Sequence, residues 1–222
     1  MASDDLPQLS SETEALLARL RSEFVGDLPG IGPDPQERLT RLFDVWRQAT
    51  LRRIVDLASG ADAFFREGRL VPGNTLTRSV VETVAIHYMV WKKLQASIEG
   101  SDWSAVHALL LSAAFGRRDK MDWKQKSIQI LTAIDHLDKA FVGFRGEYDL
   151  LCEFAHPGLA GNYGAYTHRE GDEMQYRFGI NPSDMKMGPW GQSELVHSLM
   201  VVAEIDQFLK ALRPRFVDGH KP

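Results

Sequence analysis

Hydrophobic residues recur every three or four positions over most of the chain, which is typical of amphipathic helices. The first predicted helix covers 10–24, with an N-cap at Ser10 or Ser11 and leucines on one face. A Gly/Pro-rich linker, 25–33, follows it. Asp34, followed by a proline, predicts the start of a long second helix that breaks near Gly60.

Five more helices follow from the same periodicity and from their caps and breakers. A loop at 68–74 should precede a helix capped by Asn74 or Thr75, Ser101-Asp102 should cap another, and Pro214 should stop the last. The predicted ranges are 75–98, 101–115, 123–142, 147–156 and 190–212. The middle of 75–98 is apolar on almost every side, so we expect it to be buried all round.

The pattern changes to alternation between 162 and 180, which predicts a β-hairpin. Its strands, 162–168 and 174–180, flank the turn 169–172. Two strands alone are marginally stable, so the hairpin should lie on the bundle. The prediction is therefore an all-α bundle of six or seven helices with one antiparallel β-hairpin. Residues 1–34 would form an N-terminal helix and linker, and 35–222 a single helical domain with the hairpin inserted.

Composition narrows the functional classes. The 222 residues are 44% hydrophobic, enough for a sizeable core, and carry a formal net charge of −4 that disfavours a global attraction to nucleic acid. The single cysteine excludes an internal disulfide and indicates a reducing compartment. The longest nearly apolar stretch, Val80 to Trp91, is too short to span a bilayer and contains Glu82. Together with an acidic N-terminus, this predicts a cytoplasmic protein without membrane contact.

One dense basic run keeps nucleic acid open as a partner. It is either a solvated helix start or an edge that contacts phosphate, and it consists of Arg117, Arg118, Lys120, Lys124 and Lys126.

Charged residues within apolar helices are the strongest candidates for a site. Arg78 and Glu82 are one turn apart, so they can form an internal ion pair or face a ligand together. His87 lies about 140° further round the helix at 100° per residue, so we expect a satisfied core or boundary histidine there.

The segment from Tyr148 to Pro157 places Glu153 and His156 on one side of a helix end. His156 is then either a charged C-cap or a histidine that Glu153 orients for acid–base work or for binding an anion. Cys152, four residues before His156, is a poor nucleophile because the dipole at a helix C-terminus raises a thiol pKa. We expect a small core residue there.

Two Glu-x-x-His pairs have the spacing that di-iron helical bundles use. They are Glu153/His156 and Glu194/His197, and Glu82 could add a further carboxylate. A second extra glutamate is not evident, so this set is a weak metal candidate and no cofactor is predicted. The chain also lacks a phosphate-binding glycine loop, a nucleophile elbow and a His-Glu-x-x-His motif.

With Arg78-x-x-x-Glu82 and Tyr148-x-x-Leu151-x-x-x-x-His156-Pro157, the chain resembles an uncharacterised bacterial all-helical family over roughly residues 35–212. That family is distantly compared with HEPN-type helical domains, which include RNA-cleaving proteins. Cys152 stands where the family pattern has serine. No Arg and His here match the HEPN nuclease spacing, so the resemblance implies the bundle class and not the cleavage activity.

Two functional hypotheses remain. The first is a binding or regulatory module, of the kind that serves phage defence or stress response. In it, Arg78, Glu82, Tyr148, Glu153 and His156 form a ligand pocket or a structural cluster. Apolar surface on the first helix or the Gly/Pro linker is compatible with a homodimer. The alternative is a HEPN-like enzyme that processes RNA or nucleotides with Arg78 and His156. A carboxylate/His metal-binding bundle comes third. The sequence does not decide whether the protein is an enzyme.

Overall fold

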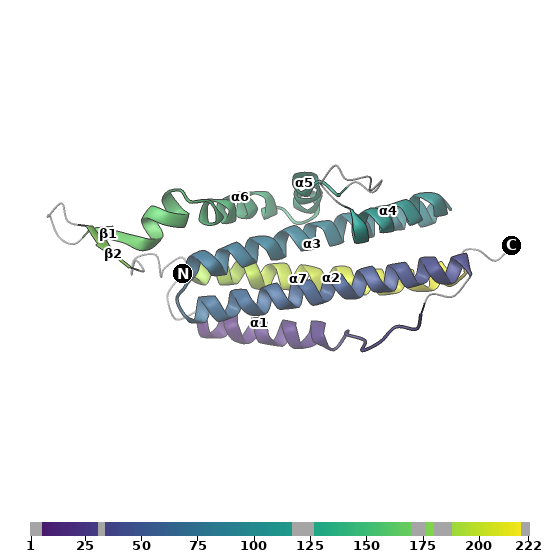
Figure 1. The fold of residues 1–222 in the computed structure, drawn as a ribbon, viewed down its shortest axis with the longest axis horizontal. Coiled ribbons are helices and arrows are strands. Elements are labelled where there is room, and N and C mark those ends of the chain that lie inside the picture. The colour runs from purple at the N-terminus through teal and green to yellow at the C-terminus, as the bar shows by residue number, and fades with distance from the viewer. Residues whose placement is uncertain (1–5, 31–33, 117–126, 170–175, 180–187, 219–222) are drawn as a thin grey trace.

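The computed structural model describes residues 6–30, 34–116, 127–169, 176–179 and 188–218. This part of the chain contains seven α-helices, one short π-helix and one two-stranded sheet, so the predicted all-α bundle with one hairpin is confirmed (Figure 1). In chain order the elements are α1 (Leu6–Arg21), α2 (Pro35–Arg66), α3 (Leu70–Glu99), α4 (Trp103–Phe115), α5 (Ile130–Ala140), α6 (Phe144–Ala155), η2 (Leu159–Gly164), β1 (Thr167–Arg169), β2 (Tyr176–Phe178) and α7 (Gly188–Asp218).

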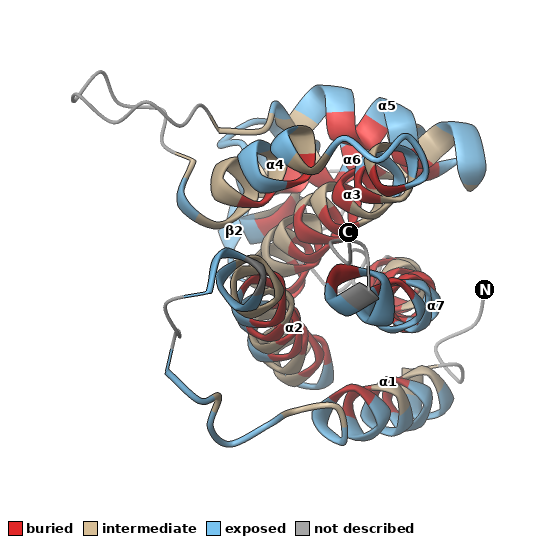
Figure 2. Cartoon of the chain, turned by 90° about the vertical axis from the view of Figure 1, so that its right-hand side faces the viewer, coloured by how far each residue is buried: buried red, intermediate tan, exposed pale blue. Residues whose placement is uncertain are grey.

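The long helices α2, α3 and α7 form the centre of the bundle (Figure 1). Helix α1 lies against α2 and α7 on one side, and α4, α5 and α6 cover α3 on the other. Figure 2 shows that the buried residues face the space between these helices. The predicted burial of the middle of α3 is confirmed, because Val80, Val84 and Val90 have no exposed surface.

Three predicted helix boundaries are confirmed. Asp34 caps α2 by accepting from the backbone N–H of Glu37 at 3.1 Å, and Asp102 caps α4 by accepting from that of Ala105 at 2.9 Å. Helix α6 ends at Ala155, directly before His156 and Pro157.

The predicted cap at Ser10 is wrong. Helix α1 already begins at Leu6, and Ser10 lies within it, where its hydroxyl donates to Asp62 of α2 at 2.8 Å. Gln192 of α7 donates to the same Asp62 oxygen and to Thr13, each at 2.8 Å. The Ser10 hydroxyl therefore hydrogen-bonds to a buried carboxylate on another helix instead of capping a helix N-terminus.

The predicted break at Gly60 is also wrong, and the loop predicted at 68–74 is shorter, because only residues 67–69 separate α2 from α3. Helix α2 continues through Gly60, where a Cβ would lie 3.0 Å from Leu76, so this glycine permits close packing of α3. Helix α3 begins at Leu70 rather than at Asn74 or Thr75. Pro72 falls in its first turn, where a helix does not need the missing N–H.

Two further boundaries need correction. Helix α7 passes through Pro214 to Asp218, because Phe216 is buried and stacked on Phe43 with 4.7 Å between the ring centroids. Helix α5 begins at Ile130, and residues 127–129 before it are not helical. The predicted helical residues 123–126 and the whole basic run from Arg117 to Lys126 lie outside the described residues.

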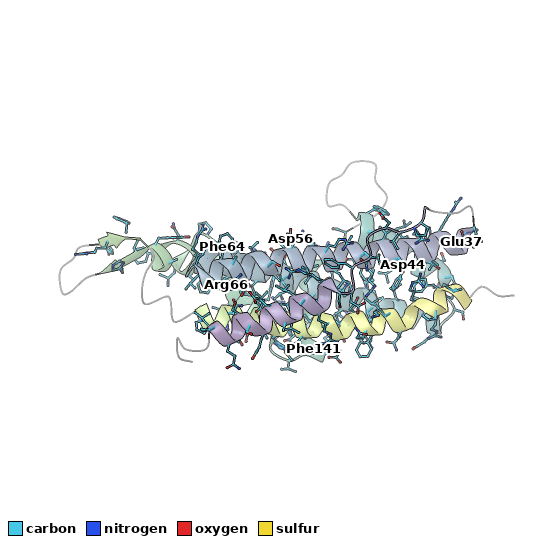
Figure 3. The ribbon with its side chains drawn as sticks, turned by 90° about the horizontal axis from the view of Figure 1, so that it is seen from below. Glu37, Asp44, Asp56, Phe64, Arg66 and Phe141 are labelled. Atoms are coloured by element: carbon cyan, nitrogen blue, oxygen red, sulfur yellow. The ribbon has the colours of Figure 1, made fainter. Side chains whose placement is uncertain are left out.

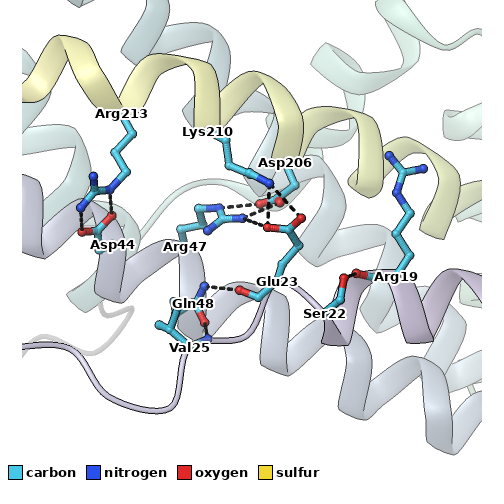
Figure 4. Close-up of polar contacts among 10 residues, drawn as sticks. All are labelled: Arg19, Ser22, Glu23, Val25, Asp44, Arg47, Gln48, Asp206, Lys210 and Arg213. Atoms are coloured by element: carbon cyan, nitrogen blue, oxygen red, sulfur yellow. Dashed lines mark hydrogen bonds and ion pairs between the residues drawn. The ribbon is translucent and has the colours of Figure 1, made fainter.

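Ion pairs join α2 and α7 in the first half of α2 (Figure 4). Arg47 donates two hydrogen bonds, each of 2.6 Å, to Asp206 of α7, and also pairs with Glu23 at 3.3 Å. Lys210 binds the same Glu23 carboxylate at 2.8 and 2.9 Å. This network joins α2 and α7 to Glu23, which lies just after the end of α1, and nothing in the local sequence pattern predicted it.

The hairpin falls within the predicted range 162–180, but its strands are shorter than predicted. Thr167 pairs with Phe178 and His168 with Arg177, whereas residues 159–164, expected partly as strand, form η2. Strand β1 packs against η2, and Figure 1 shows the sheet beyond the ends of the long helices. The expectation that the hairpin lies on the bundle is wrong. None of the helices in the described residues is long and apolar enough to cross a membrane.

Candidate functional site

Helices α3 and α6 bring Arg78, Glu82 and Tyr148 into one triad. The predicted ion pair is present, with Arg78 Nη2 3.1 Å from Glu82 Oε1. The Tyr148 hydroxyl donates to the same Glu82 oxygen at 3.0 Å and accepts from Arg78 Nη2 at 3.4 Å. The Arg78 guanidinium also lies 5.6 Å from the centre of the Tyr148 ring. Each member thus contacts the other two, and the triad links α3 to α6.

The triad lies at the boundary between core and solvent. The Arg78 and Glu82 side chains are 29% and 24% exposed, whereas Tyr148 is buried. Burial raises the pKa of Tyr148 to about 12, and its bond to the Glu82 carboxylate acts in the same direction. The phenol therefore stays protonated near neutral pH and serves as a hydrogen-bond donor. That pKa is too high for Tyr148 to exchange protons as a general acid or base at pH 7.

Glu153 and His156, the other two predicted members, do not join the triad. Both are exposed, and no hydrogen bond or ion pair involves either side chain among the residues that the structure describes. Glu153 follows Tyr148 by five residues, which turns it about 140° away round the helix. His156 caps α6 with its backbone, whose N–H donates to the Cys152 carbonyl at 3.0 Å, and its extended backbone before Pro157 directs the chain away.

Cys152 lies one turn after Tyr148 and is half-buried against the core. Its thiol interacts with the Tyr148 hydroxyl. Cys152 is therefore next to the triad, although the sequence alone had not placed it there.

His87 is buried as predicted but is not satisfied. Its ring is stacked against Trp46, and neither Nδ1 nor Nε2 has a hydrogen-bond partner within the described parts of the chain. It lies apart from the triad, on the face of α3 that meets α2.

A second polar cluster, which the sequence did not reveal, connects α6 to α7. The Trp190 indole donates to Glu147 at 3.0 Å, and the carboxyl of Glu194 lies near that of Glu147. Glu194 Oε2 is buried and has no hydrogen-bond partner in the described residues. Burial, together with the adjacent charge of Glu147, raises the pKa of Glu194 to about 7. The only signal in the sequence was Glu194 itself, because the pairing of α6 with α7 is a long-range feature.

The predicted metal candidates are dispersed. Glu82 belongs to the triad and Glu194 to the second cluster. His197 is exposed and packs on Phe144, with 4.6 Å between the ring centroids. In the described residues, no group of three or more His, Cys, Asp or Glu side chains is arranged to hold a metal ion.

Comparisons of this chain with protein-family models, with curated proteins and with solved structures find no match. Function must therefore be argued from the geometry alone.

Proposed function

We propose that this chain is a binding module that acts through contact with a second copy of itself. The contact surface would be the hairpin projection, which we define as residues 158–169 and 176–179. The observation that carries the proposal is its exposed apolar surface. Large apolar or aromatic side chains gather there, with Phe178 84% exposed and Leu159 74% exposed, accompanied by Tyr163, Tyr166 and Tyr176. An exposed cluster of this kind is typical of interaction sites.

The sheet supports a homotypic contact. In the described residues, the sheet consists of β1 and β2 alone. Two short strands are marginal on their own, and a symmetric copy would extend them to four strands. A two-fold axis brings the same edge of each copy together, so one self-complementary surface suffices.

The triad is assigned a structural role in this proposal. An enzyme that used Arg78 and His156 on phosphate would need both groups to face one site. The triad instead has its charges paired within the fold, and His156 lies outside it. The contact between α3 and α6 is then a link that holds the base of the hairpin projection in place.

The test is the molar mass in solution, measured by sedimentation equilibrium from micromolar to millimolar protein. We expect the wild type to reach the dimer mass over this range. The double variant Tyr176→Ser/Phe178→Ser should raise the dimer dissociation constant at least tenfold, because both apolar side chains leave the contact.

Val142→Ser is the matched control, since Val142 is 91% exposed in the turn before α6 and lies outside the hairpin projection. It should leave the dissociation constant unchanged. A monomeric wild type at every concentration would disprove the homotypic contact, and equal weakening by Val142→Ser would disprove the assignment of its surface.

A further inference from the structure

A cavity lies between the end of α1 and the middle of α2, on another part of the bundle from the hairpin projection. Figure 3 shows α1 running along α2 and ending beside its middle. The cavity volume is about 560 Å³, and three arginines from the two helices line it. Its lining comprises Arg21, Phe24, Arg52, Arg53, Val55, Asp56 and Ser59.

The three guanidiniums have only neutral hydrogen-bond acceptors. Arg21 donates to the Ser59 hydroxyl at 2.8 Å, Arg52 to the Val25 carbonyl at 2.5 Å, and Arg53 to the Thr83 hydroxyl at 3.3 Å. Within the described residues, no carboxylate lies within ion-pair distance of any of them. Each guanidinium has five N–H donors, so most donors remain available to a ligand.

Three arginines elsewhere in the bundle are paired with carboxylates. Arg47 pairs with Asp206, Arg78 with Glu82 and Arg213 with Asp44. The lining of the cavity therefore concentrates positive charge that the fold does not neutralise. Asp56 is its only carboxylate, which leaves a net charge of +2.

The cavity is also partly preorganised. The Arg52 guanidinium lies 4.3 Å from the centre of the Phe24 ring, and its bond to Val25 fixes it from the other end. The Arg21 bond to Ser59 holds a second guanidinium across the gap between the helices. A ligand would therefore meet donors whose positions are already restricted.

We propose that this cavity binds a small phosphomonoester. Planar guanidiniums match phosphate oxygens in charge and in geometry, and the net charge of +2 matches a dianionic phosphate. The volume exceeds that of phosphate alone, so it accommodates a small organic group. Asp56 accepts a hydrogen bond from a hydroxyl of that group, which selects sugar-like phosphates over inorganic phosphate.

The test is isothermal titration calorimetry at 50 mM salt with ribose 5-phosphate, inorganic phosphate and ribose as probes. We expect one saturable site for ribose 5-phosphate, weaker binding of inorganic phosphate and none of ribose. Arg21→Ala and Arg53→Ala should each weaken ribose 5-phosphate binding about tenfold or more, through the loss of charge-assisted hydrogen bonds.

Arg19→Ala is the control, because Arg19 lies in the same turn of α1 as Arg21 and its side chain is directed toward α7 (Figure 4). It should change the dissociation constant less than twofold. Arg53→Lys retains the charge and should recover part of the affinity, which separates loss of the site from loss of folding. The proposal is overturned if the wild type does not bind ribose 5-phosphate, if ribose binds as tightly, or if Arg19→Ala weakens binding as much as Arg53→Ala.

Discussion

The imidazole of His87 is stacked against the indole of Trp46, with 5.0 Å between the ring centroids and 28° between the planes. The imidazole has no exposed surface, and both ring nitrogens lack hydrogen-bond partners in the described residues. Burial, with the charge of Arg47 as a second cause, lowers the pKa of His87 to about 3. The ring is therefore neutral in the folded protein and functions as an aromatic core residue.

This burial predicts a loss of stability in acid. The folded-state pKa of about 3 lies below the ordinary value of 6.5. The contribution of neutral His87 to the free energy of unfolding is therefore fully present above pH 6.5 and is lost as the pH falls toward 3. At pH 5 the loss should be about 2 kcal/mol. His87→Phe keeps the stacked ring and should abolish this dependence in urea denaturation at pH 5, 6 and 7.5. An unchanged dependence in the variant would assign it to other groups.

Glu194 predicts a dependence of the opposite sign. Its folded-state pKa of about 7 lies above the ordinary 4.5, so the folded protein binds the extra proton and stability falls as the pH rises from 4.5 through 7. Allowing for partial solvent screening, the fall is about 1–2 kcal/mol. Glu194→Gln should remove it, whereas Glu204→Gln, at an exposed position on the same helix, should not.

The two dependences oppose each other between pH 5 and 6.5. We therefore expect the stability of the wild type to rise with pH in this interval, but less steeply than it would with His87 alone. His87→Phe should reveal the fall caused by Glu194, and Glu194→Gln should reveal the rise caused by His87. Parallel profiles in both variants would contradict the two assignments together.

The sequence predicted correctly those helix boundaries that depend only on interactions between neighbouring residues. The caps at Asp34 and Asp102 formed because each carboxylate needs only the backbone of the next turn. Local signals failed where a distant helix intervened. The Ser10 hydroxyl bonds to Asp62, fifty-two residues away, and Pro214 remains within α7 because Phe216 packs on Phe43.

The same distinction applies to the candidate site. The spacing of Arg78 and Glu82 predicted their ion pair, since residues four apart share a helix face. The position of His156 depends on how Pro157 directs the backbone after the helix, which helical periodicity does not describe. The proximity of Glu147 to Glu194 depends on the packing of α6 and α7, which are separated in sequence by the hairpin.

The triad predicts small effects on stability. Tyr148→Phe removes the donor to Glu82 and should lower the free energy of unfolding by about 1 kcal/mol. Glu82→Ala should cost about 1 kcal/mol rather than the 3–5 kcal/mol of a fully buried pair, because both charged side chains are partly exposed. Tyr88→Phe, on α3 like Glu82, is the control in urea denaturation, because the Tyr88 hydroxyl makes no hydrogen bond within the described residues. A loss of several kcal/mol at Glu82 would indicate a dry, fully buried pair.

Gly191 of α7 packs directly against side chains of α2 and α3. A Cβ at this position would overlap Asn74 Oδ1 and lie 2.8 Å from Phe65 Cζ. Asn74 is completely buried and Phe65 nearly so, so neither side chain has space in which to retreat. Gly191→Ala should therefore lower the free energy of unfolding by about 1–3 kcal/mol through overpacking, despite the better helix propensity of alanine.

Gly146→Ala is the matched comparison, since Gly146 lies in the first turn of α6 and a Cβ there meets no atom within 4 Å. It should stabilise the protein by about 0.5–1 kcal/mol in the same thermal or urea denaturation. Equal changes in both variants would mean that helix propensity, and not the contact with Asn74 and Phe65, determines the effect at Gly191.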